Sequence, residues 1–254
     1  MIQKIITICN AKGGVGKTTS TASIGACMAL MGKKVLLIDL DGQANLTLYY
    51  IPDDSEIEVS IFDSLISGEP LPIINVKENL DIVPSSLEMA SAEIALTNLL
   101  AREQILSRLL DDVKQDYDYI LIDCPPSLGI VTTNAFLAAD EILVPMTPEL
   151  LPLKGMRMLD SFITSLQKVK PSIHLSGVFT TRFNHRKLNK AVENVVRNRY
   201  QDITLQSRIR ENIALAESAG SGNSIFEYDP NSNGAKDYQA LTEVLHLQFQ
   251  QPDS

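Results

Sequence analysis

The sequence predicts an α/β fold, with a doubly wound, mostly parallel sheet flanked by helices. Short apolar runs rich in β-branched residues recur along the chain, at 5–10, 35–40, 80–85, 119–124, 141–146 and 175–181. Continuous apolar runs indicate strands that are covered on both faces. Helix-like segments lie between them, for example 18–31, closed by Gly32, and 87–114. Strands that alternate with helical crossovers favour right-handed connections within one sheet.

The chain is expected to form a single domain over residues 1–254, because its length suits one sizeable core and no linker or repeat divides it. No further helix-turn-helix domain is expected before the first strand. Near the other end, 229–235 (DPNSNGA) predicts a turn and 236–249 a last helix. That helix is expected to pack an apolar stripe against the core, since apolar side chains recur there at helical spacing. They are Tyr238, Leu241, Leu245 and Phe249.

Composition narrows the function classes. The cysteines Cys9, Cys27 and Cys124 match no metal or redox spacing, so buried reduced thiols are expected. No run of about 18 apolar residues and no secretory leader is visible, which favours a cytoplasmic protein without a membrane partner. The net charge of -9 speaks against nucleic-acid binding in general, although a local basic patch can override the average.

A glycine-rich segment after the first strand carries the clearest chemical signal. It reads NAKGGVGKT, which is a P-loop with Asn10 where the first glycine usually stands. Such loops cradle phosphates with backbone N–H groups at the start of a helix. Lys17 would contact the β- and γ-phosphates and the Thr18 hydroxyl would ligate Mg²⁺. We therefore expect a deviant P-loop that binds a nucleotide together with Mg²⁺. The expected nucleotide-binding residues are Lys12, Gly13, Gly14, Val15, Gly16, Lys17, Thr18 and Thr19.

Three carboxylates follow predicted strands. Asp123 ends the apolar run YILID, the position of a carboxylate that holds Mg²⁺ through water. Asp39 and Asp41 follow the run VLLID and would lie on one side of the backbone if that strand continues. We assign Asp41 to orienting the attacking water and Asp39 to a supporting contact with Mg²⁺-bound water. Helix capping by Asp39 is the alternative.

Four ordered motifs resemble one family almost from end to end. They are KGGVGKTT at 12–19, LLIDLDGQANLT at 36–47, YDYILIDCPPSLG at 117–129 and YDPNSNGAKDYQALTEVL at 228–245. The sequence thus resembles the ParA/MinD group of deviant Walker A ATPases, and within it the short, Soj-like ParA partition proteins.

This resemblance implies roles for the catalytic lysines. Lys12 matches the family's signature lysine, which reaches the phosphates bound by the other subunit of an ATP-sandwich dimer, whereas Lys17 serves its own nucleotide. Lys12, Lys17 and Asp41 are therefore the expected catalytic residues. The segment after Asp123 resembles a switch that reports the γ-phosphate. Family members bind nonspecific DNA as ATP dimers on the nucleoid, and a ParB-like partner stimulates hydrolysis; the implied function is segregation of a plasmid, chromosome or mobile element.

The charge distribution is consistent with DNA binding. Basic residues are concentrated in 182–199, and two more follow, which suits phosphate contacts without base reading. A solvated helix face is the alternative. Arg186 matches a DNA-contacting arginine of the family. The candidate DNA contacts are Arg182, Arg186, Lys187, Lys190, Arg208 and Arg210.

The segment 209–222 (IRENIALAESAGSG) departs from the family's common IPRNVRLSEAPSHG. Ala214 stands where the family often has a DNA-binding arginine, and Arg210 stands where it has a proline near the adenine. Asn212 is retained and is expected to contact the base. Either Arg208 and Arg210 take over the DNA contacts, or DNA affinity is weak.

Other functions stay open. A MinD-like division regulator would need a basic amphipathic terminal helix, which HLQFQQPDS does not supply. A reductase or cluster-assembly ATPase would need surface cysteines, and Cys124 suits strand-end packing instead. A positioning ATPase for a non-DNA cargo would use the same nucleotide cycle with a different partner.

Overall fold

One mixed sheet of eight strands organises the part of the chain that the computed structural model describes, residues 4–51, 57–148, 152–184 and 186–250. The strands are β1 (Lys4–Ile8), β2 (Val35–Asp39), β3 (Ile74–Lys77), β4 (Leu80–Val83), β5 (Tyr119–Asp123), β6 (Glu141–Met146), β7 (Gly177–Phe183) and β8 (Thr204–Arg210). Their order is β3-β4-β2-β5-β1-β6-β7-β8. The β3–β4 pair is antiparallel and the other pairs are parallel, which confirms the predicted fold class.

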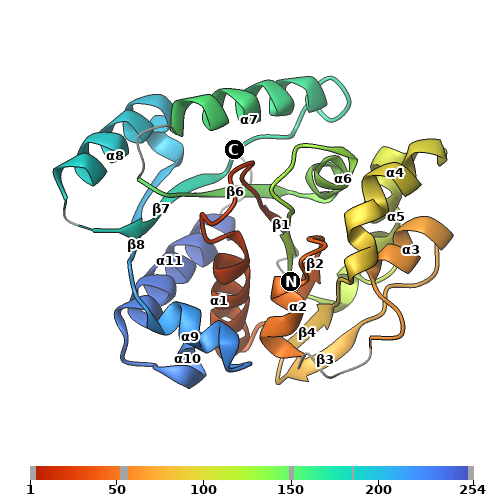
Figure 1. The fold of residues 1–254 in the computed structure, drawn as a ribbon, viewed down its shortest axis with the longest axis horizontal. Coiled ribbons are helices and arrows are strands. Elements are labelled where there is room, and N and C mark those ends of the chain that lie inside the picture. Colours follow the sequence, from red (N-terminus) through yellow and green to blue (C-terminus); the bar gives the residue numbers. More distant parts are fainter. Residues whose placement is uncertain (1–3, 52–56, 149–151, 185, 251–254) are drawn as a thin grey trace.

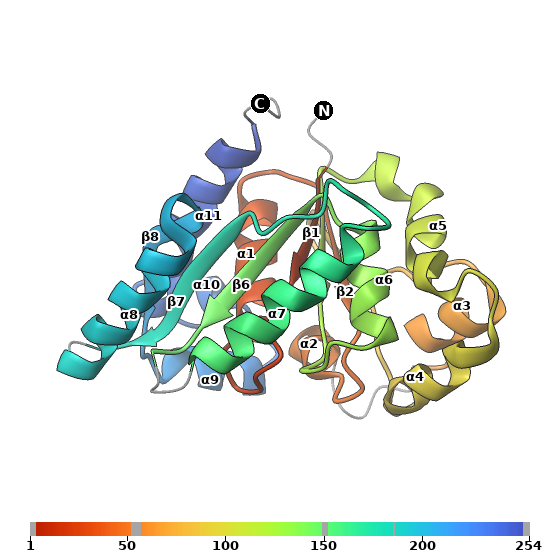
Figure 2. The same ribbon diagram turned by 90° about the horizontal axis from the view of Figure 1, so that it is seen from above.

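Helices cover both faces of this sheet (Figures 1 and 2). On one face lie α3 (Ile61–Ser67), α4 (Ala92–Ala95), α5 (Ile105–Asp111), α6 (Ile130–Ala138), α7 (Pro152–Leu166) and α8 (Lys187–Tyr200). On the other lie α1 (Lys17–Leu30), α2 (Asn45–Tyr50), α9 (Ala214–Gly220), α10 (Ile225–Tyr228) and α11 (Asn233–Phe249). Crossovers by helices are what parallel strands require, because a short hairpin cannot join them.

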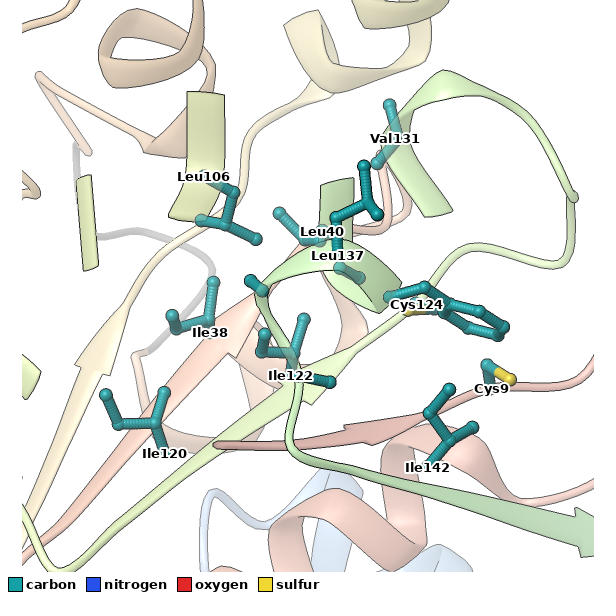
Figure 3. Packing of buried hydrophobic residues seen from close by; sticks show 14 of the residues in the cluster. Cys9, Ile38, Leu40, Leu106, Ile120, Ile122, Cys124, Val131, Leu137 and Ile142 are labelled. Atoms are coloured by element: carbon teal, nitrogen blue, oxygen red, sulfur yellow. The ribbon is translucent and has the colours of Figure 1, made fainter. Parts of the chain in front are cut away.

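Two apolar cores follow from this layering. In β2, Leu36 and Ile38 face one core while Val35 and Leu37 face the other, so the strand is apolar throughout. Figure 3 shows the first core, where Ile38 and sheet neighbours point towards side chains of α5 and α6. Burial on both sides explains the continuous apolar runs of the central strands.

The helix at each end of the chain matches its prediction closely. Helix α1 runs to Leu30, and Gly32 follows with φ 75°, a left-handed conformation suited to glycine. Helix α11 starts at Asn233, inside the segment predicted as a turn, because the Ser232 hydroxyl caps it by accepting from the Ala235 N–H at 3.1 Å. Its predicted stripe is buried, from Tyr238 to Phe249. The three cysteines are buried and reduced, as expected.

The prediction of one helix over 87–114 is wrong. Short helical turns occupy 87–98, then the backbone turns at Ala101, which has a left-handed φ of 49°, and α5 follows. The buried Asn134 of α6 fixes this reversal, because its amide donates to the Arg102 carbonyl at 2.7 Å and accepts from the Leu106 N–H at 3.1 Å. A contact from a distant helix therefore overrides the local helical pattern.

Candidate functional site

The glycine-rich loop lies between β1 and α1, at the carboxyl edge of the sheet. Gly14 and Gly16 have φ values of 72° and 85°, a left-handed region where side chains are strained. Gly16 is the residue that precedes α1, so the helix starts with Lys17. The loop therefore places a helix N-terminus, with its unpaired N–H groups, at the end of a cleft, which is a site suited to phosphate.

Side chains from neighbouring strands hold this loop in place. The Asn10 amide donates to the Pro145 carbonyl of β6 at 2.8 Å, and its oxygen accepts from the Lys12 N–H at 3.0 Å. The Thr181 hydroxyl of β7 donates to the Val15 carbonyl at 2.7 Å. Asn10 thus ties the loop to β6 where P-loops usually have glycine. Sequence reasoning missed Thr181, because nothing local in the chain links it to a loop 166 residues away.

The two lysines of the loop point to different places. Lys17 is buried and lines the cleft together with Gly13, Gly14 and Thr18. Lys12 is exposed, and its ammonium lies 3.5 Å from the Thr147 hydroxyl beyond β6. Lys12 is absent from the residues that line the nucleotide cleft. Of these two lysines, Lys17 is the one that lines the cleft.

Thr18 lies against the end of β5, as a magnesium site requires. Its hydroxyl donates to Asp123 Oδ2 at 2.6 Å, and Asp123 is fully buried. Asp39 is the register partner of Asp123 on β2, so two carboxylates end neighbouring strands side by side. Hard oxygen ligands of this kind are those that Mg²⁺ takes in nucleotide sites.

Burial perturbs both strand-end carboxylates. It raises the pKa of Asp39 to about 6, against hydrogen bonds from Thr47 that lower it. It raises the pKa of Asp123 well above its usual range, and the neighbouring Asp39 adds to this rise. A divalent cation beside Thr18 would keep both carboxylates ionised. Its positive charge would offset the repulsion between Asp39 and Asp123 and the loss of their hydration on burial. The donor set therefore fits Mg²⁺.

Asp39 and Asp41 differ in surroundings. Strand β2 ends at Asp39, so the alternation that would align the two side chains does not extend to Asp41. The Asp39 carboxylate accepts from the Thr47 N–H at 2.9 Å in the first turn of α2, a helix whose N-cap residue is Ala44. Its other oxygen accepts from the Asp41 N–H at 3.1 Å. Asp39 thereby fixes the backbone of Asp41.

Asp41 is the carboxylate that reaches the cleft. It is partly exposed, lines the cleft with the P-loop and accepts from the Gln43 N–H at 3.0 Å. The Ser85 hydroxyl donates to the Asp41 carbonyl at 2.8 Å, which anchors the loop from β4. A carboxylate held in this way beside Lys17 and Thr18 suits orientation of a water molecule.

The cleft continues from the P-loop to a wall formed by the end of β8 and by α9, with a volume of about 1310 Å³. Figure 2 shows α2 and α9 along the same edge of the molecule, and Tyr49 and Ser218 join them by a 2.9 Å hydrogen bond. Asn212 lies in this wall and caps the start of α9, accepting from the Ala214 N–H at 2.8 Å. The structure thus brings Asn212 and the P-loop to one cleft.

The candidate DNA contacts separate into three groups. Arg182 and Arg210 line the nucleotide cleft. Arg208 pairs with the buried Glu193 at 2.6 Å and lies over the Phe183 ring. The remaining three are exposed around the start of α8, and they are Arg186, Lys187 and Lys190.

A P-loop at the switch point of a doubly wound sheet, with Thr18 on a strand-end aspartate, defines the chain as a P-loop nucleotide-binding protein. Residues 3–175 match the protein family described as an AAA domain.

Known proteins refine this class. The sporulation initiation inhibitor protein Soj of Bacillus subtilis is 39% identical over 95% of this chain and 98% of that protein. The chromosome-partitioning ATPase Soj of Treponema pallidum is 35% identical over 95% of this chain and 96% of that protein. The crystal structure of cobyrinic acid a,c-diamide synthase from Mycobacterium smegmatis, with bound ATP analogue and magnesium, has 30% identity and a TM-score of 0.85 over 98% and 96% of the two chains. The chain belongs to the family of Soj- and ParA-type ATPases.

No helix in the described ranges is both long and apolar enough to span a membrane.

Proposed function

We propose that this protein is a partition ATPase. It binds ATP and Mg²⁺, forms an ATP-dependent homodimer and in that form binds nonspecific double-stranded DNA on the nucleoid, in the cytoplasm. A ParB-like, centromere-binding partner stimulates hydrolysis, and the cycle segregates plasmid, chromosome or mobile-element DNA. The similarity to Soj of Bacillus subtilis and of Treponema pallidum supports this proposal.

The direction of Lys12 is the observation that carries the proposal. Its ammonium lies towards Thr147 and outside the lining of its own nucleotide cleft. A cation on a phosphate loop that is directed away from its own phosphates suits a role at a second nucleotide. Supplying that cation in trans stabilises charge on the transferred phosphoryl group only after two subunits have met. Hydrolysis then depends on dimerisation.

Other residues of the same subunit bind the phosphates and the metal and orient the attacking water. Lys17 holds the β- and γ-phosphates, and Thr18 ligates the metal with Asp123 and Asp39 behind it. Bound Mg²⁺ supplies charge neutralisation at the phosphates. Asp41, fixed through its backbone by Asp39 and Ser85, orients the attacking water. The reaction is hydrolysis of ATP to ADP and phosphate.

Redox and cluster-assembly functions find no support in the cysteines. Burial raises the pKa of Cys27 to about 11 and that of Cys124 well above its usual range. Thiolates rather than thiols bind metals and react, and cysteines buried in this way are suited to packing.

Light scattering and ATP turnover of the Lys12→Ala variant test the dimer. The control is Lys34→Ala, which removes an exposed lysine just before β2. Lys12→Ala is expected to retain monomer ATP binding and to lose at least about 100-fold in turnover. Asp41→Ala is expected to accumulate the ATP dimer. Normal turnover by Lys12→Ala would refute the role in trans.

A test of DNA binding measures its salt dependence in the presence of ATP. The three exposed cations around the start of α8, Arg186, Lys187 and Lys190, would give six phosphate contacts per dimer, and hence a slope of log affinity against log salt of about -5. Arg186→Ala should reduce this slope by about 2 per dimer. Absence of ATP-dependent DNA binding would contradict the partition function. ATP-dependent DNA binding without stimulation by a ParB-like partner would instead favour a positioning ATPase for a non-DNA cargo, which uses the same nucleoid DNA.

A further inference from the structure

The segment 85–93, which begins soon after β4, supports the loop that carries Asp41. At its start, the Ser85 hydroxyl donates to the Asp41 carbonyl at 2.8 Å. Further along, its backbone passes so close to the same loop that a Cβ on Gly42 would lie 2.7 Å from the Ala90 nitrogen. A hydrogen bond and a close backbone contact therefore fix the position of this loop against the segment.

The far end of the same segment contacts the start of α6. The Glu93 carboxylate of α4 accepts from the Ile130 N–H at 2.8 Å, and Figures 1 and 2 both show α4 beside α6. Gly129, the residue before α6, has no side chain to cap the helix, and the first turn holds no acidic residue. Glu93 thus supplies, from a distant part of the chain, the acceptor and the negative charge that a helix N-terminus favours.

The start of α6 is joined to the nucleotide site by the loop 124–129, which follows Asp123. Pro126 of this loop lines the nucleotide cleft. The Thr132 hydroxyl of α6 donates to the Ser127 carbonyl at 2.7 Å, so the loop and the first turn of the helix are tied together. A carboxylate that fixes the start of α6 therefore also restrains the loop after Asp123.

We propose that Glu93 is a positioning residue for ATP hydrolysis, which holds the loop after Asp123 in place relative to the loop of Asp41. The P-loop, which would bind the phosphates, is tied to β6 and β7 instead. Loss of Glu93 should therefore slow turnover and spare ATP affinity. This inference rests on the ATPase part of the proposed function and is independent of DNA and of any partner protein.

Gly129 offers a way to remove the contact without replacing Glu93. A Cβ on Gly129 would lie 2.1 Å from Glu93 Oε1, so an alanine there displaces the carboxylate. The backbone of Gly129 has φ -104° and ψ -158°, an extended conformation that alanine also adopts. Gly129→Ala should therefore act through Glu93 and leave the conformation of its own loop unchanged.

The test combines steady-state ATP turnover of the whole chain, at saturating ATP and Mg²⁺, with calorimetric titration of ATP. Glu93→Ala and Gly129→Ala are each expected to lower turnover by about tenfold and to keep ATP affinity within about twofold of the wild type. The double variant should lose no more than either single variant, because both substitutions remove the same contact. Unchanged turnover in either single variant, or losses that multiply in the double variant, would overturn the inference. A loss of ATP affinity as large as the loss of turnover would also overturn it, because the whole site would then be damaged.

The conservative variant tests the hydrogen bond itself. Glu93→Gln retains an oxygen that can accept from the Ile130 N–H but lacks the negative charge, so its turnover should fall by only about threefold. A loss in Glu93→Gln equal to that in Glu93→Ala would contradict the hydrogen bond as the cause.

Matched controls separate this effect from folding. Glu88→Ala removes an exposed glutamate of the same segment that lies outside the lining of the nucleotide cleft, so its turnover should equal that of the wild type. Thermal unfolding without nucleotide reports on folding, and Gly129→Ala and Glu93→Gln serve if Glu93→Ala is unstable. Failure of the wild type to hydrolyse ATP would refute the proposed function, whereas normal turnover in Glu93→Ala refutes only this inference.

Discussion

The hydroxyl of Thr181 offers a sharp test of how the fold prepares the phosphate loop. Thr181 is 2% exposed on β7, and its hydroxyl donates to the carbonyl of Val15 in the middle of the loop. Thr181→Val keeps the shape of the side chain and removes this donor. The buried Val15 carbonyl then lacks its partner, which costs about 1 to 3 kcal/mol. If the loop relaxes to recover that cost, ATP affinity should fall by about 5-fold to about 100-fold.

The neighbouring strand provides the matched control. Among the described side chains, the Thr204 hydroxyl of β8 is one of those buried without a hydrogen-bond partner. Thr204→Val should therefore leave ATP affinity unchanged and stabilise the fold by between zero and about 1 kcal/mol. Equilibrium titration with ATP and thermal unfolding of both variants give the comparison. Equal effects of the two substitutions would refute the reasoning, since the hydrogen bond is what distinguishes them.

Three further predictions follow from packing and charge. Leu241→Ala, at a fully buried position of α11, should cost about 2 to 5 kcal/mol and lower the Tm by about 5 to 15 °C, while Leu247→Ala, 62% exposed on the same helix, should change little. Gly42→Ala should lower the free energy of unfolding, measured in denaturant, by about 1 to 3 kcal/mol, because the new methyl group would lie 2.7 Å from the Ala90 nitrogen. It should also slow ATP hydrolysis, since Gly42 follows Asp41 in the same loop. Burial lowers the pKa of His246, so the unfolded chain binds a proton more readily than the folded one, and stability should fall as pH drops below about 6.5. The stability of His246→Gln, measured over a pH series, should depend less on pH in this range. A pH dependence identical to that of the wild type would contradict the prediction.

The sequence predicts the centre of the sheet well and its edges poorly. Central strands such as β2 and β5 are buried on both faces and therefore show continuous apolar runs. Strand β8 alternates, with Gln206 and Arg208 exposed, and β3 is exposed over Ile74 and Asn75. Both strands were missed, because side chains that stay exposed interrupt their apolar runs.

In the nucleotide site, too, some features can be predicted from the sequence and others cannot. Gly14, Gly16, Lys17 and Thr18 form a local pattern whose chemistry depends on spacing along the chain, and all four line one cleft. Contacts between distant elements leave no such pattern. Thr47 holding Asp39 illustrates this, because only the folded chain shows that α2 begins against the end of β2.

Basic residues illustrate why charge counted along a chain is a coarse guide to partners. Glu193 is 4% exposed, and a carboxylate buried to this extent requires a cationic partner. It forms ion pairs with the guanidinium groups of Arg197, at 3.2 Å, and Arg208, at 2.6 Å. Asp237 takes Arg210 in the same way. These arginines stabilise packing or the cleft, so lost DNA binding on their substitution would not by itself identify a phosphate contact. The exposed cations at the start of α8 are different, because a helix N-terminus adds its own N–H groups and positive dipole to theirs, as phosphate contacts commonly use. A duplex held through α8 would therefore leave the nucleotide cleft open.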